Sequence, residues 1–87
     1  MLQVTVTGGE TRVSFDPGSK LNIAKAGEAK NEFARIVKGE NGRMVLDLAN
    51  LEYIDSSGVG ALLSLLRLCK EHKWTLSLIN PQQAVKD

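Results

Sequence analysis

The sequence has few of the residues on which disulfide, metal and acid–base chemistry depend. It contains one cysteine, Cys69, so no disulfide can form within the chain. Its single histidine, His72, completes no Cys/His set with metal-ligand spacing. Cys69 lies in an apolar stretch, where a small buried hydrophobic role is expected of it. We therefore expect a protein without a metal or cofactor of its own.

Clustered charge and long apolar runs are lacking as well. Eleven basic and ten acidic residues give a net charge of +1 and are well mixed along the chain. This balance argues against nucleic-acid binding, which needs a basic surface. No stretch reaches the ~20 apolar residues of a membrane span, and no secretory signal opens the chain. The sequence predicts one cytoplasmic domain over residues 1–87, with a modest core from its 43% apolar content.

The first half of the chain predicts a hairpin followed by a helix. Residues 2–7 alternate apolar and polar side chains, Gly8-Gly9 suits a tight turn, and residues 11–15 return as a second strand. Residues 22–38 then have helical spacing, with Asn22 as the N-cap. The expected apolar side of this helix consists of Ile23, Ala26, Ala29, Phe33, Ile36 and Val37.

The second half predicts a βαβ unit. Residues 44–49 are nearly all apolar, as expected of an interior strand covered on both faces. Asp47 interrupts this strand, as either a hydrogen-bonded core carboxylate or a functional group. A helix over residues 57–72 is apolar almost all round, which predicts burial on several sides or an apolar flank shown to a partner. A strand over residues 74–79 follows.

Together these segments predict an α/β fold. Its mixed sheet of four or five strands comes from the N-terminal hairpin and the βαβ unit, with helices packed on it. Asn80-Pro81-Gln82-Gln83 has the pattern of a helix start, but the sequence stops at Asp87. We expect a truncated C-terminal helix, whose loss would expose apolar surface and favour homodimers.

The turn from Asp55 to Gly60 is the unusual spot in this unit. A dinucleotide-binding turn would need a third glycine, where Leu63 stands. A serine hydrolase would need a nearby histidine, but His72 lies about four helical turns, roughly 22 Å, from Ser56. We therefore expect no catalysis by this chain.

Two interpretations of the turn remain. Any of Asp55, Ser56 and Ser57 could cap the following helix, and helix-start statistics favour this structural role. Three polar residues exceed what one cap needs, however. Gly58 and Gly60 weaken the first turn and leave its backbone open to close approach by another molecule. A serine at a helix N-terminus also suits phosphorylation, because first-turn N–H groups and the helix dipole accommodate a phosphate.

The residues of this region resemble a known family. Val45-Leu46-Asp47-Leu48 followed by Tyr53-Ile54-Asp55-Ser56-Ser57-Gly58-Val59-Gly60 is similar to the STAS domain of anti-sigma factor antagonists. The resemblance covers essentially the whole chain and implies a STAS-like fold. It also implies that Ser56 is phosphorylated by a partner, an anti-sigma factor that is itself an ATP-binding serine kinase. A serine phosphatase would reverse the reaction.

The resemblance further implies a partner-binding surface around the phosphoacceptor. The residues expected there are Asp55, Ser57, Gly58, Val59, Gly60 and Asn22. The family usually has a Gly-Glu-Leu-Asp stretch at this surface; here it is Ser19-Lys20-Leu21-Asn22, so that Asn22 replaces the aspartate.

Two functions follow from the resemblance. In the first, unmodified Ser56 lets the chain sequester the anti-sigma factor and free a sigma factor, and phosphorylation releases it. In the second, the chain is a non-switching STAS module, a structural or regulatory subunit of a transporter or signalling complex. Ser56 and Ser57 favour the switch, because transporter-associated members often lack a phosphorylatable serine there.

Overall fold

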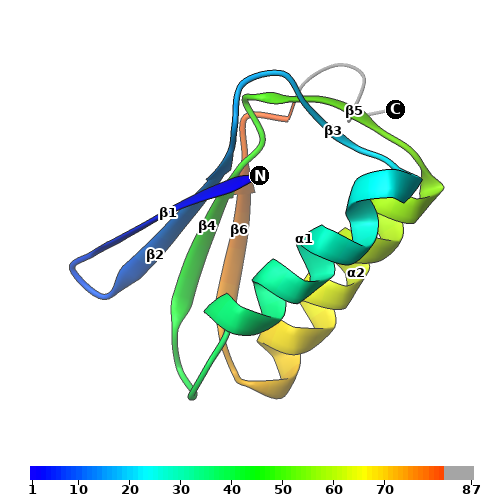
Figure 1. Ribbon diagram of the computed structural model, residues 1–87. Coiled ribbons are helices and arrows are strands. Elements are labelled where there is room, and N and C mark those ends of the chain that lie inside the picture. Colours follow the sequence, from blue (N-terminus) through cyan, green and yellow to red (C-terminus); the bar gives the residue numbers. More distant parts are fainter. Residues whose placement is uncertain (82–87) are drawn as a thin grey trace.

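The computed structural model describes residues 1–81 and arranges them as six strands and two helices (Figure 1). The elements are β1 (Leu2–Thr7), β2 (Glu10–Phe15), β3 (Ser19–Leu21), α1 (Ile23–Ile36), β4 (Arg43–Asp47), β5 (Leu51–Ile54), α2 (Ser56–Glu71) and β6 (Thr75–Ile79). The predicted helix start over residues 80–83 falls mostly outside the described residues.

The main sheet has four strands in the order β1-β2-β4-β6. β1 and β2 form the predicted antiparallel hairpin, whereas β2, β4 and β6 run parallel to one another. α1 and α2 lie side by side against one face of this sheet (Figure 1). The α/β class and the mixed sheet with helices packed on it are therefore confirmed.

A second, two-stranded sheet joins the helix layer to the main sheet. β3 and β5 pair in parallel at the end of the molecule where both helices begin (Figure 1). Neither β3 nor β5 is among the strands that the sequence predicts. Strands of three and four residues are too short to show a period-two pattern clearly, and β3 pairs with an irregular register.

The expectation that the strand after residue 43 is covered on both faces is wrong. Met44 and Leu46 are buried beneath the helices, but Val45 and Asp47 on the opposite face are only half-buried. Within residues 1–81 the sheet has helices on one face alone, and alternate residues of β4 are more exposed on the other face (Figure 1). Asp47 is hydrogen-bonded, since its Oδ1 accepts from the backbone N of Ala49 (2.9 Å) and from Asn80 Nδ2 (3.2 Å).

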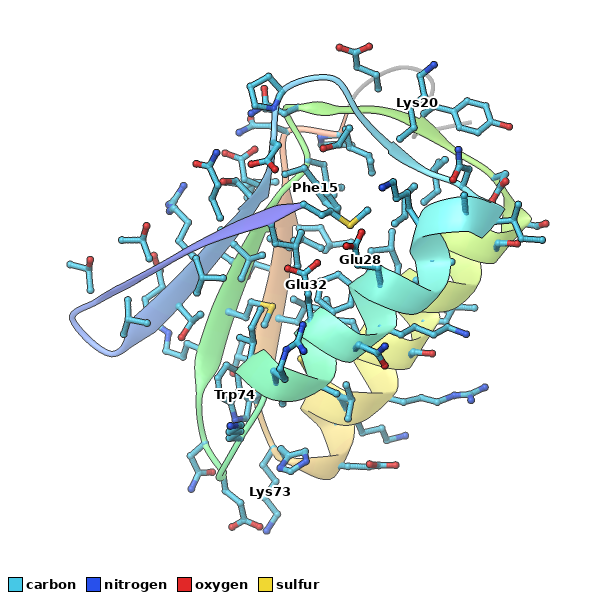
Figure 2. The ribbon with its side chains drawn as sticks, viewed as in Figure 1. Phe15, Lys20, Glu28, Glu32, Lys73 and Trp74 are labelled. Atoms are coloured by element: carbon cyan, nitrogen blue, oxygen red, sulfur yellow. The ribbon has the colours of Figure 1, made fainter. Side chains whose placement is uncertain are left out.

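The core fills the space between the helix layer and the sheet. Phe15 from β2 and Phe33 from α1 are fully buried in it, and Figure 2 shows Phe15 on the side of the sheet that faces α1. Cys69 is buried as expected, and desolvation raises the pKa of its thiol, which keeps the sulfur protonated. The remaining buried hydrophobic residues are Val13, Leu21, Ala26, Ala29, Val37, Met44, Leu46, Leu48, Leu51, Ala61 and Leu65.

A matched pair of leucines in α2 tests this arrangement. Leu65 is fully buried, so Leu65→Ala should leave a cavity and lower the free energy of unfolding by about 3 kcal/mol. Leu63 is 51% exposed, and Leu63→Ala should cost less than about 1 kcal/mol. Urea denaturation of both variants measures the difference. Equal losses would show that the helix faces the sheet with a different side.

Candidate functional site

The predicted turn lies where β5 ends and α2 begins. Asp55 is the N-cap of α2, in extended backbone geometry, and its Oδ1 accepts a hydrogen bond from the backbone N of Gly58 (3.1 Å). Its own backbone N donates to the carbonyl oxygen of Leu21 (3.3 Å), which ties the turn to β3. The capping role is therefore confirmed for Asp55, and Ser56 and Ser57 are not needed for it.

The second carboxylate oxygen of Asp55 reaches the other helix. Asp55 Oδ2 accepts from the backbone N of Ile23, the first residue of α1 (3.2 Å). Asn22 caps the same helix, since its Oδ1 accepts from the backbone N of Ala24 (3.1 Å). One negative charge thus lies at the N-termini of two helices, where unpaired N–H groups and the helix dipoles favour it. Asp55 fixes the two helix ends side by side.

The two glycines of the turn have different surroundings. Gly58 is buried, and a Cβ atom there would overlap the carbonyl oxygen of Leu21 and lie 2.7 Å from Cγ1 of Ile54. The sequence predicts that another molecule approaches the backbone at Gly58, but in the structure β3 of the same chain occupies this position. Gly60 is half-buried, and a Cβ atom there would meet nothing within 4 Å. Of these two positions, only position 58 requires a glycine for packing.

Ser56 is the exposed serine of the pair. It occupies the first helical position of α2 and is open to solvent, whereas Ser57 is half-buried. Val59, one turn further along, is 46% exposed. Of the residues predicted for the site, Ser56 and Val59 reach the surface, Asp55 and Asn22 hold the helix ends, and Gly58 packs beneath them.

Ile23 lies at the surface, although its helical spacing predicts the core side of α1. This residue is 79% exposed. It follows the Asn22 cap directly, in the first turn, and its backbone N–H is the group bonded to Asp55. Tyr53, 46% exposed, precedes the turn on β5. Ile23, Tyr53 and Val59 are thus exposed apolar residues on the elements that meet at the turn of Asp55 and Ser56, and together with Ser56 we call them the Ser56 surface.

This apolar exposure continues along α2. Leu63 and Leu66 are 51% and 54% exposed, and with Val59 they recur at helical spacing on the side opposite Ala61 and Leu65. The sequence predicts that this helix is either buried on several sides or shows an apolar flank, and the structure shows an exposed apolar flank.

A hollow of about 490 Å³ lies where β3 leads into α1. Asn22 lies at this hollow as well as at the cap of α1. The other residues that line it are Met1, Asp16, Pro17, Gly18, Ser19, Lys20, Ala24, Lys25 and Glu28. The hydrogen bond from Gln3 and the ammonium group of Met1, 3.3 Å away, lower the pKa of Asp16.

No metal centre is formed by His, Cys, Asp and Glu side chains within residues 1–81. No helix in this part of the chain is long and apolar enough to cross a membrane. His72 ends α2, and its Nδ1 lies 2.9 Å from the carbonyl oxygen of Gly39. It belongs to the end of the molecule opposite Ser56.

Comparison with known proteins identifies the family. The family model of the STAS domain matches residues 2–87, and the chain therefore belongs to the STAS domain family. A search of curated proteins found no match.

Several solved structures share the fold. Unphosphorylated SpoIIAA, the anti-sigma factor antagonist of Bacillus, has a TM-score of 0.72 at 18% identity, over 99% of this chain and 78% of its own. An anti-sigma factor antagonist from Mycobacterium paratuberculosis has a TM-score of 0.73 at 20% identity, over 95% of this chain and 70% of its own. The murine anion transporter Slc26a9 has a TM-score of 0.79 at 19% identity, over 94% of this chain and 13% of its own. The chain spans only 20% of another similar structure, Mglu.

The two glycines provide a test of the site's construction. Gly58→Ala should lower the free energy of unfolding by about 2 kcal/mol or more, because the methyl group would press on the backbone of β3. Gly60→Ala should raise it by up to about 1 kcal/mol, since alanine is the better helix former and the site has room. Thermal unfolding of both variants compares them. A neutral Gly58→Ala would show that β3 and α2 are not in contact there.

Proposed function

We propose that the chain is an anti-sigma factor antagonist whose partner binding is switched by phosphorylation of Ser56. In this function the unmodified chain binds an anti-sigma factor with serine kinase activity in the cytoplasm and so frees a sigma factor. ATP belongs to the partner kinase, and a serine phosphatase restores the chain. The chain itself acts by binding and not by catalysis.

The observation that carries this proposal is the exposed Ser56 in the first turn of α2, together with exposed Ile23, Tyr53 and Val59 on the elements that meet at this turn. A kinase needs access to the hydroxyl, and a binding partner needs apolar area to bury. Both requirements meet at this one surface. SpoIIAA, which shares the fold, has been solved in a phosphorylated form, and this supports a phosphoacceptor at the corresponding turn.

Phosphorylation would change the charge of the surface more than its fold. A phosphate adds about −1.5 to −2 charge beside the carboxylate of Asp55. Asp55 already holds Gly58 N and Ile23 N, so the caps of both helices are in place before the phosphate arrives. In an interface, like-charge repulsion and added bulk cost several kcal/mol, and each 1.4 kcal/mol weakens binding tenfold. That is enough for a switch.

The second candidate is a non-switching STAS module in a transporter or signalling complex. The similarity to Slc26a9 and to a sulfate transporter family protein from Wolinella succinogenes supports it. Both candidates use the same fold, and they differ in whether Ser56 accepts phosphate. A module of this second kind would bind its assembly equally well with serine or alanine at position 56.

Phosphorylation can be followed by mass. Incubation with the candidate anti-sigma kinase and ATP should add about 80 Da to the wild-type chain. Ser56→Ala should abolish this gain and still bind the kinase, while the half-buried neighbour variant Ser57→Ala should retain it. Ser56→Glu should bind poorly, because it carries a negative charge. Phosphate on Ser57 in the wild-type chain would contradict the assignment, and no mass gain with any cellular kinase would favour the non-switching module.

A further inference from the structure

The apolar flank of α2 borders a free edge of the main sheet. β6 is the last strand in the order β1-β2-β4-β6, and α2 packs on it, whereas α1 lies on the other side of α2 (Figure 1). The right-handed crossover from β4 through α2 to β6 turns Val59, Leu63 and Leu66 away from α1 and toward this edge. The side of α2 toward α1 instead carries the half-buried Ser57 and Ser64.

Leu78 extends this apolar flank onto the sheet. It pairs in register with Leu46, which is fully buried beneath the helices, so its side chain projects to the same face of the sheet. Nevertheless Leu78 is 53% exposed, since β6 ends the sheet within residues 1–81. We call Val59, Leu63, Leu66 and Leu78 the α2–β6 surface; Val59 also belongs to the Ser56 surface.

The backbone along the outer side of β6 is available for pairing, because no strand within residues 1–81 lies there. Thr75 N donates to the residue before β4 (2.9 Å), and Ile79 O accepts from Leu48 N (2.9 Å), so both residues direct their backbone groups toward β4. These directions alternate along a strand, so Leu76 and Leu78 direct their N–H and C=O groups outward. β6 also contains no charged residue and no proline, which commonly protect an edge from pairing.

We infer that the α2–β6 surface binds a second copy of this chain through antiparallel pairing of the two β6 strands. With Leu76 of one copy opposite Leu78 of the other, the outward backbone groups of both residues meet, and Ser77 lies opposite itself on a two-fold axis. The axis is perpendicular to the sheet, so the helices of both copies lie on the same face. The two α2 flanks then face each other above the paired leucines.

The α2–β6 surface suits a copy of itself because its four residues are uncharged and apolar. Lys70 continues the flank one turn beyond Leu66 and is exposed. Since the two α2 helices run antiparallel across the axis, the two Lys70 side chains lie at opposite ends of the interface and do not oppose each other. Each lies toward the end where the other copy has its Asp55 carboxylate.

The other edge of the sheet is less suited to symmetric pairing. β1 is also an edge strand, and Val4 and Val6 are 47% and 70% exposed. However, Figure 2 shows Glu32 on the side of α1 nearer the β1–β2 hairpin, and its Oε2 is already buried without a hydrogen-bond partner. Pairing at β1 would enclose this carboxylate together with its copy, which desolvation and like charge disfavour. These observations select β6.

Sedimentation velocity of the 87-residue chain between about 10 µM and 1 mM tests the association. One helix flank and one short strand are fewer than the about 20 residues a side of a standard interface, so we expect a Kd on the order of 100 µM. The species should be a dimer and nothing larger, because a two-fold interface closes on itself.

Variants locate the interface. Leu66→Lys should weaken the dimer at least about tenfold, because it places a charge in the apolar contact. Val6→Lys is the matched control, since Val6 is an exposed apolar residue at the other edge, and it should change the Kd less than about twofold. Circular dichroism checks that both variants are folded.

A cysteine on the two-fold axis tests the register. Residues opposite each other in a non-hydrogen-bonded antiparallel pair have Cα atoms about 4.5 Å apart, which a disulfide can span. Ser77→Cys should therefore give a disulfide-linked dimer under mild oxidation, read as a doubled mass without reductant. Thr5→Cys, also exposed but on β1, should stay mainly monomeric, and the buried Cys69 is inaccessible in both variants.

Four results would overturn the inference: a monomer at 1 mM, equal effects of Leu66→Lys and Val6→Lys, no cross-link through Ser77→Cys, or an equally fast cross-link through Thr5→Cys. A monomer would mean that the chain after Pro81 or another protein covers the α2–β6 surface. The inference does not depend on the proposed function, because none of these experiments involves phosphorylation of Ser56.

Discussion

A single carboxylate holds the functional end of this molecule together. Asp55 accepts one backbone N–H from α2 and one from α1, and its own backbone N–H is bonded to β3. Two helix N-termini carry partial positive charge and would otherwise repel each other, so a shared anion stabilises their contact. The positions of Ser56 and Ile23, the residues next to these bonds, follow from it.

The packing beneath Asp55 reinforces the same geometry. Gly58 lets the first turn of α2 rest on the backbone of β3, a contact that a side chain would prevent. Within residues 1–81, β3 and β5 pair with each other and not with the main sheet, so they form a separate platform. The platform places Lys20 and Tyr53 beside the helix ends. A hydrogen-bonded base with exposed apolar and charged groups suits the partner-binding surface that we propose.

Much of the fold could be predicted from sequence because its elements have clear periodicity. The hairpin with its Gly8-Gly9 turn, the two helices and the parallel strands of the βαβ unit all have patterns long enough to read. The exposure of the outer face of β4 could not be predicted, since an apolar run does not reveal how many helix layers cover a sheet. β3 and β5 could not be predicted, because strands of three and four residues are too short to show an alternating pattern.

The candidate site was predictable in position but only partly in its roles. The row of polar residues and glycines marked the turn, and the capping rule left Asp55, Ser56 and Ser57 as candidates, of which the structure shows Asp55 as the cap. That Asp55 also reaches Ile23, thirty-two residues away in the chain, is a tertiary contact that local pattern cannot show. The exposure of Ile23 has the same origin, because helical spacing indicates a face and not where along a helix the packing begins.

The proposed switch requires that phosphate on Ser56 act on the partner interface and leave the domain unchanged. Calorimetry with the proposed anti-sigma kinase should compare the unmodified chain with a chain carrying phosphoserine at position 56, incorporated during synthesis. We predict binding weaker by roughly 30-fold or more, which corresponds to about 2 kcal/mol, together with an unchanged thermal unfolding midpoint. Equal affinities of the two forms would contradict a phosphorylation switch at Ser56.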